Sequence, residues 1–210
     1  MNELVIEGGV PLCGTIRAAG NKNAVLPMMA AALLTDQPVT LENVPDIGDV
    51  HTMGELLRGL GAEVAWDAEN KRLTLVAERV DPDGLSFSLC RRIRASILLA
   101  APVVLRAGRV RIDMPGGDII GRRRIESHLV GLRQLGAHVA GEQRIDFRAE
   151  KGLHGGEVFL PEASVTGTEQ LLVAAAGARG RTVIRNAACE PHVCDVARML
   201  AGMGAKIDGI

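Results

Sequence analysis

Hydrophobic and polar positions repeat along this chain in three similar units. Leucines or methionines three and four residues apart precede Gly-Ala in 57–64 (LRGLGAEV), 132–139 (LRQLGAHV) and 200–207 (LAGMGAKI). This spacing places the apolar side chains on one face of a helix, and glycine commonly follows a helix end. The pattern predicts three amphipathic helices that each end in Gly-Ala and lead into a strand.

A second kind of helix, apolar on nearly every side, comes earlier in each unit. These segments are 21–35, 92–105 and 168–178, and a predicted strand follows each of them, at 39–44, 109–114 and 181–186. A helix without a polar face is buried all round, so we expect these three helices inside and the sheets outside. One unit could not bury such a helix alone, and the three units are therefore expected to close around a shared helical core.

The predicted unit has the order β-α-β-α-β-β. The first two copies continue through a β-hairpin with the turn residues DAEN and GEQ, whereas the third stops within AKIDGI at 205–210. The predicted fold class is α/β: an inside-out α/β barrel domain of three β-α-β-α-β-β repeats over 21–210, with buried helices, outer sheets and a truncated third repeat. Residues 1–20 are predicted to form two short strands whose contacts lie elsewhere. An incomplete hairpin leaves an unpaired edge, which is typical of a piece of something larger.

Composition excludes several function classes. The chain is 47% hydrophobic and 23% charged, as expected of a globular domain, and its formal net charge is -1, so no overall basic field indicates a nucleic-acid or membrane partner. Aromatic residues make up only 2%, which leaves few rings for stacking nucleic-acid bases. The longest apolar run, 97–105, is far shorter than the roughly 20 residues of a membrane span. Four cysteines without a CxxC pair indicate reduced thiols in a cytoplasmic protein, and no metal site is predicted.

One loop carries a strong local concentration of charge. The segment 114–128 reads MPGGDIIGRRRIESH and places one carboxylate between paired glycines and three arginines. Glycines allow the backbone to approach a ligand closely, and the arginines indicate an anion site. RNA binding through 122–124 is a weak alternative, because the chain has few aromatic residues and almost no net charge.

Several segments together resemble a known enzyme family. AAGNKNAVLP, RIRASIL, PGGDIIGRRRIESHLVGLRQLGA, ASVTGTE and IRNAACEPHVCDVARMLAGMGAKI occur in the order found in the UDP-N-acetylglucosamine 1-carboxyvinyltransferases, a family of enolpyruvyl transferases. The likeness covers the whole chain and implies the N-terminal half of a two-domain enzyme, with the first strands contacting the missing second domain. It also implies transfer of the enolpyruvyl group of phosphoenolpyruvate to the 3-hydroxyl of UDP-N-acetylglucosamine, with release of phosphate and without a cofactor.

The resemblance assigns roles to individual residues. Lys22 and Asn23 open the first apolar helix, where helix N–H groups favour anions; the family implies that Lys22 contacts phosphoenolpyruvate and Asn23 the sugar nucleotide. Without the resemblance, an exposed lysine and an N-cap asparagine are the simpler interpretation. The remaining substrate-binding residues that it implies are Arg94, Arg123, Arg124, Ile125, Glu126, Ser127, Ser164, Val165 and Thr166. Of these, Arg123 matches the arginine that clamps phosphoenolpyruvate.

Asp118 stands where most members of the family carry a cysteine. The cysteine acts there as general acid toward phosphoenolpyruvate, and a carboxyl group could deliver the same proton, although its ordinary pKa of about 3.9 is low for that task. A carboxylate cannot react as a thiolate with an epoxide, so we expect the intact enzyme to resist fosfomycin. The alternative for Asp118 is a turn-forming aspartate after Gly-Gly. His128 is either a half-buried capping histidine or a catalytic group.

Two other functions stay open at the level of sequence. The sister enolpyruvyl transferase of the shikimate pathway shares the implied fold and chemistry. A non-catalytic module that binds a nucleotide sugar is the alternative from another class, because the family's base for the sugar hydroxyl lies in the second domain. The chain alone is therefore expected to be inactive.

Overall fold

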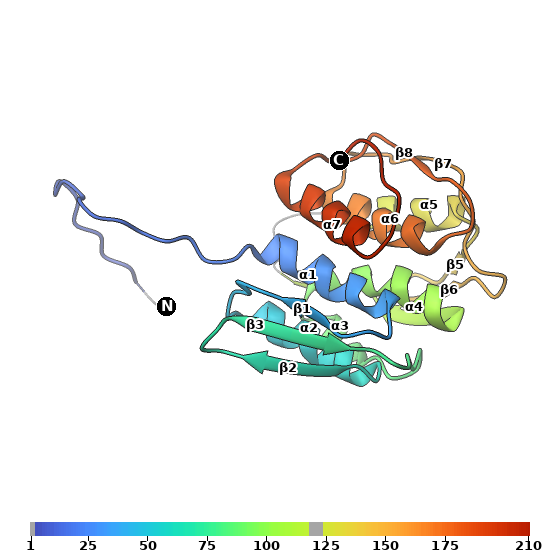
Figure 1. The fold of residues 1–210 in the computed structure, drawn as a ribbon, viewed down its shortest axis with the longest axis horizontal. Helices are drawn as coiled ribbons and strands as arrows, with labels where there is room; N and C mark the ends of the chain where they lie inside the picture. Colours follow the sequence, from blue (N-terminus) through green and yellow to red (C-terminus); the bar gives the residue numbers. More distant parts are fainter. Residues whose placement is uncertain (1–2, 118–123) are drawn as a thin grey trace.

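Three apolar helices form the centre of the molecule. The computed structural model describes residues 3–117 and 124–210 and shows these helices packed side by side (Figure 1). They are α1 (Lys22–Ala31, continued by the 3-10 turn Ala32–Leu34), α4 (Ala100–Ala107, preceded by the 3-10 helix η2, Arg94–Leu99) and α6 (Val165–Gly177). Small residues permit their close approach: a Cβ on Gly177 would lie 2.7 Å from Leu105 Cδ1. The expected buried helices are confirmed.

Amphipathic helices pack against this centre and end in the same way. They are α2 (Gly48–Gly59), α5 (Glu126–Gln134) and α7 (Pro191–Gly202), with one short extra helix, α3 (Phe87–Cys90). A glycine with positive φ follows each of the three longer helices, at Gly61, Gly136 and Gly204. The next alanine N–H donates to the carbonyl oxygen five residues back at 2.9–3.0 Å, which satisfies helix-end carbonyls. The helix ends predicted from Gly-Ala are therefore confirmed in all three places.

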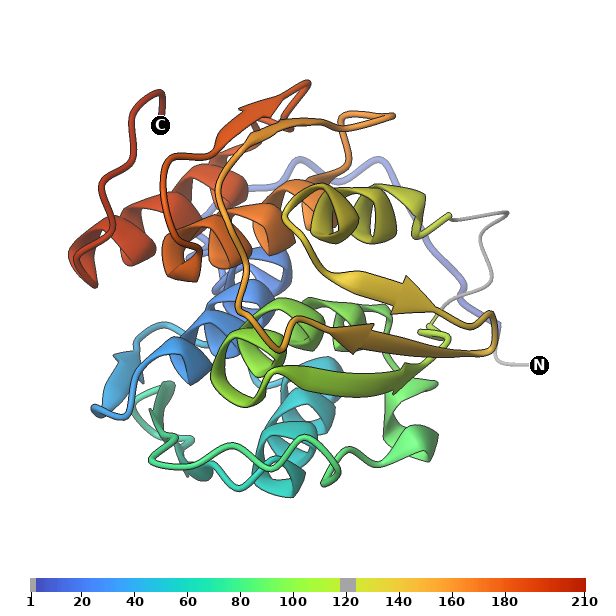
Figure 2. The same cartoon turned by 90° about the vertical axis from the view of Figure 1, so that its right-hand side faces the viewer.

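Two antiparallel sheets have corresponding strand orders, and the second of them, coloured green to gold, is seen clearly in Figure 2. The first contains β1 (Val39–Leu41), β3 (Arg72–Val76) and β2 (Glu63–Asp67); the second contains β4 (Arg109–Asp113), β6 (Arg144–Arg148) and β5 (His138–Ala140). In each sheet the second hairpin strand lies in the middle, paired with both neighbours. Alternate residues, such as Ile145 and Phe147, point into the core. A third sheet pairs β7 (Glu157–Phe159) in parallel with β8 (Val183–Arg185).

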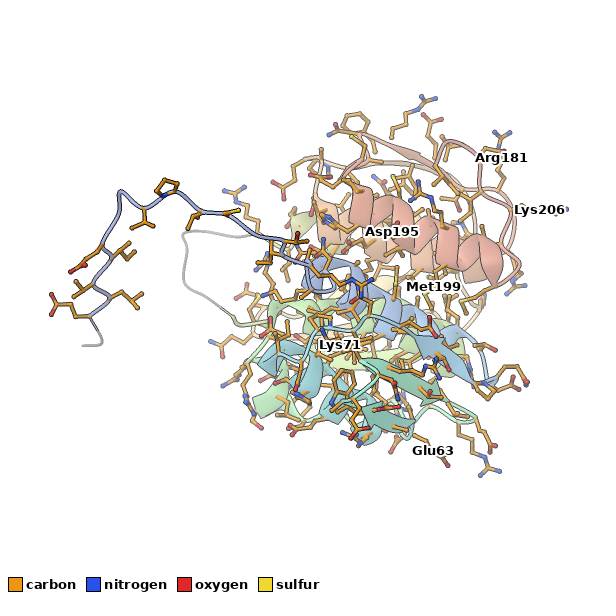
Figure 3. The ribbon with its side chains drawn as sticks, turned by 60° about the vertical axis from the view of Figure 1, so that its left-hand side comes forward. Glu63, Lys71, Arg181, Asp195, Met199 and Lys206 are labelled. Atoms are coloured by element: carbon orange, nitrogen blue, oxygen red, sulfur yellow. The ribbon has the colours of Figure 1, made fainter. Side chains whose placement is uncertain are left out.

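The two ends of the chain form no strands within the described residues. Described residues 3–20 form no strand; they extend away from the helices, and their side chains project into open space (Figure 3). Large apolar side chains are exposed along this segment, up to 98% for Leu12. A strand needs a partner for its backbone groups, and this segment has no strand partner within the described residues. Residues 205–210 also form no strand, so the predicted start of a third hairpin is absent.

Candidate functional site

The three central helices begin at one end of the molecule and finish together at the other. Their last turns, with the end of α7, line a cavity of about 690 Å³ whose walls include Leu34, Leu105 and Gly177. The predicted binding residues Lys22, Arg94 and Val165 stand at the opposite end, each as the first residue of its helix. Helix starts present N–H groups without intrahelical acceptors and a partial positive charge. The candidate site is therefore at these helix starts rather than in the cavity.

The start of α1 carries one ion pair and one cap. Lys22 Nζ lies 3.0 Å from Asp49 Oδ2 on α2, and both side chains are more than one-third exposed. The N-cap residue is Asn21, whose side chain accepts from the N–H of Asn23 at 2.8 Å. The alternative of Asn23 as N-cap is therefore wrong. Asn23 lies in the first turn, and its side chain is exposed.

The glycine pair of the charged loop packs against the start of η2. A Cβ on Gly116 would lie 1.6 Å from the carbonyl oxygen of Arg91, and one on Gly117, whose φ is +96°, would lie 3.3 Å from the backbone nitrogen of Arg94. No side chain fits at Gly116. The glycine pair thus allows a close backbone approach to the protein's own backbone, and the predicted approach to a ligand stays a prediction. Arg94 Nη2 also donates to the carbonyl oxygen of Arg124 at 2.7 Å.

A buried carboxylate anchors the same region. Asp113, at the end of β4, is 1% exposed and pairs with Arg144 Nε at 2.8 Å and with Arg91 Nη2 at 2.7 Å. The hydrogen bond from Arg144 and the charge of Arg91 hold the pKa of this carboxyl below its usual value. The Arg144 guanidinium also stacks 3.7 Å from the centre of the Phe87 ring. Arg91 is itself largely exposed, and its guanidinium forms an ion pair with this buried acid.

His128, the third residue of α5, joins two helix starts. Its Nδ1 lies 2.5 Å from Gln170 Oε1 and its Nε2 lies 3.0 Å from Thr166 Oγ1, both on α6. The ring is 1% exposed rather than half-buried, and burial lowers its pKa to about 4, an effect to which the nearby charge of Arg94 adds. His128 is therefore a neutral, internal group. It does not face solvent as a capping or acid-base residue would.

The start of α6 lies three residues earlier than predicted. Ser164 is the N-cap residue, and its Oγ accepts from the N–H of Gly167 at 3.2 Å. Val165 and Thr166 thus belong to the first turn rather than to a preceding loop. A Cβ on Gly167 would lie 3.0 Å from the Cβ of Ser127, so this glycine lets α5 and α6 meet.

The predicted segment 124–127 alternates between exposed and buried side chains. Ser127 is buried, and its Oγ has no hydrogen-bond partner within the described residues. Ile125 is buried as well, whereas Arg124 and Glu126 are exposed. The structure therefore brings 124–128, 164–167 and Arg94 together. Asp118, Arg122 and Arg123 lie outside the described residues, so the predicted meeting of Lys22, Arg94 and Arg123 stays a prediction.

Three polar residues inside α6 were missed by the sequence reasoning. Thr168, Glu169 and Gln170 are buried although their helix is otherwise apolar. Thr168 Oγ1 accepts from the N–H of Ala188 at 2.9 Å, which ties the segment before α7 to α6. Burial, with a smaller effect of Glu190, raises the pKa of Glu169 to about 8. A run of three polar residues in a segment predicted to be buried all round was the signal that could have identified them.

The described residues hold no cluster of three histidine, cysteine or acidic side chains suited to a metal ion. No helix in these residues has the length and apolar character needed to cross a membrane.

Comparison with known proteins identifies related sequences and a related structure. The family model described as EPSP synthase (3-phosphoshikimate 1-carboxyvinyltransferase) matches residues 6–210. UDP-N-acetylglucosamine 1-carboxyvinyltransferases from Bradyrhizobium diazoefficiens and Treponema denticola are 53% and 46% identical to the chain over 99% and 100% of its length. The crystal structure of the enolpyruvyl transferase NikO from Streptomyces tendae superposes with a TM-score of 0.82 over 96% of the chain, at 25% identity. The predicted resemblance is confirmed.

The chain spans about half the length of the curated relatives that it matches. It covers 48% and 49% of the two bacterial enzymes and 47% of the solved structure. The mixed α/β architecture is thus that of one half of an enolpyruvyl transferase.

Proposed function

Since the chain belongs to the EPSP synthase (3-phosphoshikimate 1-carboxyvinyltransferase) family, we propose that it is half of a UDP-N-acetylglucosamine 1-carboxyvinyltransferase. This enzyme transfers the enolpyruvyl group of phosphoenolpyruvate to the 3-hydroxyl of UDP-N-acetylglucosamine and releases phosphate. The reaction is the first committed step of peptidoglycan synthesis. The observation that carries the proposal is the meeting of Arg94, the backbone of 124–128 and the first turn of α6 at one end of the helical core.

The charge of the substrates fits this end of the molecule. Both substrates are multiply anionic, and arginines and helix N–H groups neutralise phosphate and carboxylate groups. When phosphoenolpyruvate binds, Lys22 leaves its ion pair with Asp49 and contacts the substrate. The free-energy cost of breaking this pair is small, because a half-exposed ion pair contributes at most about 1 kcal/mol. Asn23, Arg94 and the first turn of α6 hold the sugar nucleotide. Asp118 as general acid and Arg123 as clamp complete the phosphoenolpyruvate site, on the strength of the resemblance.

The second half of the enzyme supplies what this chain lacks. We place residues 1–20 against that second domain, because the exposed apolar side chains between Leu4 and Ile16 require a cover. The three units of 21–210 then form the inside-out barrel around the helical core. Residues of the second domain complete the active site, so the chain alone binds substrate without turnover. The reduced cysteines suit a cytoplasmic enzyme.

A release-of-phosphate assay tests the proposal. The chain is mixed with a separately expressed second half, phosphoenolpyruvate and UDP-N-acetylglucosamine; we expect phosphate only when all four are present. Arg94→Ala is expected to abolish most of this activity, whereas Arg92→Ala, a change at an exposed neighbour, leaves it within twofold. Turnover with shikimate 3-phosphate instead would assign the chain to the sister enzyme. Binding of UDP-N-acetylglucosamine without any turnover would identify a nucleotide-sugar binding module.

A further inference from the structure

The buried contacts of His128 define its tautomer. Gln170 Nε2 donates to the carbonyl oxygen of Ile97 at 2.9 Å. A carbonyl can only accept, so the amide of Gln170 must present its oxygen to His128. An amide oxygen is likewise only an acceptor, and the proton of the ring therefore lies on Nδ1. The orientation of the Gln170 amide thus determines the tautomer of the His128 imidazole.

The Thr166 hydroxyl can then act toward this ring only as a hydrogen-bond donor. Burial and the charge of Arg94 keep the imidazole neutral, with its pKa lowered to about 4. A neutral ring protonated on Nδ1 offers a lone pair at Nε2, 3.0 Å from Thr166 Oγ1. The threonine hydroxyl donates into that lone pair. Its hydrogen is consequently directed inward, and the groups that remain for an anion at this turn are backbone N–H groups of α6.

These contacts link the starts of η2, α5 and α6 to one another. Arg94 of η2 reaches the carbonyl of Arg124 just before α5, His128 of α5 reaches Thr166 and Gln170 of α6, and Gln170 returns to Ile97 of η2. His128 and Gln170 are each 1% exposed, so solvent does not compete for these bonds. The side-chain hydrogen bonds that the structure shows between α5 and α6, within the described residues, therefore all pass through the His128 imidazole.

We propose that His128 is a positioning residue, which spaces the starts of η2, α5 and α6 for the diphosphate of the nucleotide sugar, and that the Thr166 hydroxyl serves His128 instead of the ligand. This inference rests on the proposed function for the identity of the ligand. It assigns the Thr166 side chain to His128, so that Thr166 contacts the substrate only through its backbone.

The test combines three variants with binding measurements on the 210-residue chain. His128→Asn keeps a donor toward Gln170 and removes the acceptor of Thr166; Thr166→Val removes the hydroxyl at nearly constant volume; Thr166→Ser keeps it. Isothermal titration with UDP-N-acetylglucosamine should show Kd raised about fivefold to tenfold for His128→Asn and for Thr166→Val, as expected for one lost hydrogen bond. Thr166→Ser should stay within twofold of the wild type.

The double variant distinguishes the two roles of Thr166. If its hydroxyl acts through His128, Thr166→Val adds no more than twofold to the Kd of His128→Asn. A full additional fivefold or more in the double variant would mean that the hydroxyl contacts the ligand, and the inference would be overturned. Thermal unfolding of each variant, with Thr166→Ser as the matched control, identifies any general loss of fold.

Nitrogen-15 spectra of the imidazole test the tautomer without any ligand. We expect a protonated Nδ1, an unprotonated Nε2 and no titration of His128 between pH 5.5 and 8. A proton on Nε2, or titration in that range, would contradict the inference. If the wild-type chain does not bind UDP-N-acetylglucosamine, the proposed function fails, and the positioning role is then judged from backbone amide shifts. His128→Asn must move the amides of 124–127 and 164–167; unchanged amides there would refute it.

Discussion

Replacing Glu169 by glutamine should change how the stability of the protein depends on pH. The Glu169 carboxyl is 1% exposed, and one of its oxygens has no hydrogen-bond partner within the described residues. Burial is the main reason that its pKa rises to about 8 from an ordinary value of 4.5. Glutamine has nearly the same shape and cannot ionise, so Glu169→Gln removes this titration while it preserves the packing.

The sign and size of the effect follow from proton binding in the two states. Between pH 4.5 and pH 8 the unfolded chain has lost the Glu169 proton, whereas the folded chain retains it. The folded state therefore binds more protons, and the contribution of Glu169 to stability is fully present below pH 4.5 and is lost as the pH rises through 8. At about 1.4 kcal/mol per pH unit, this interval corresponds to a loss of roughly 5 kcal/mol.

Urea unfolding at a series of pH values between 4.5 and 8.5 measures this effect. The free energy of unfolding of Glu169→Gln minus that of the wild type should rise across the series by several kcal/mol, in favour of the variant. His128 has a lowered pKa, so its contribution makes the protein less stable as the pH falls from 6.5 toward 4. This contribution is the same in the variant and the wild type, and it therefore cancels when the two free energies of unfolding are subtracted. Glu190→Gln, a change at an exposed neighbour, should retain most of the wild-type slope. A difference that stays constant with pH would refute the assignment of a protonated Glu169.

Three further predictions concern other parts of the structure. Asp113→Asn should lower the free energy of unfolding, measured in urea titrations, by roughly 1–3 kcal/mol, because it removes the buried carboxylate that two arginines share. The control Asp146→Asn affects a more exposed ion pair and should lower it by less than about 1 kcal/mol. Gly167→Ala should cost roughly 1–3 kcal/mol by the same measurement, since its Cβ would press on α5, and Gly48→Ala, with open space around it, should cost nothing. The reassembled enzyme should keep its phosphate release after long incubation with fosfomycin, and Asp118→Cys should introduce time-dependent inactivation; inactivation of the unmodified enzyme would count against a role of Asp118 in place of the cysteine.

Local sequence patterns were sufficient for most of the helices and hairpins. The Gly-Ala helix ends were predictable because a glycine in the left-handed conformation is a common way to satisfy the last carbonyl groups of a helix. The buried helices were predictable because alanine-rich segments without a polar face can be stable only inside. The start of α6 was predicted too late, since Val165, Thr166 and Gly167 have weak helix propensity and resemble a loop until Ser164 is recognised as the cap.

Contacts between distant segments could not be predicted from local patterns. The partner of Lys22 is 27 residues away, and that of His128 is 42 residues away. The ion pair of Arg91 with the buried Asp113 likewise joins residues 22 positions apart in the chain. Residues 3–20 have the alternation of strands, but a strand also requires a partner edge, and sequence patterns do not specify where that edge lies.

Chemical-shift mapping of the isotope-labelled chain shows whether the starts of the central helices bind the sugar nucleotide. On addition of UDP-N-acetylglucosamine, we predict the largest changes in backbone amide shifts at Asn23, Arg94, 124–128 and 164–167. Equal concentrations of shikimate 3-phosphate should have little effect. Changes confined to the opposite ends of these helices, around Leu34, Leu105 and Gly177, or no changes at saturating concentration, would contradict this prediction.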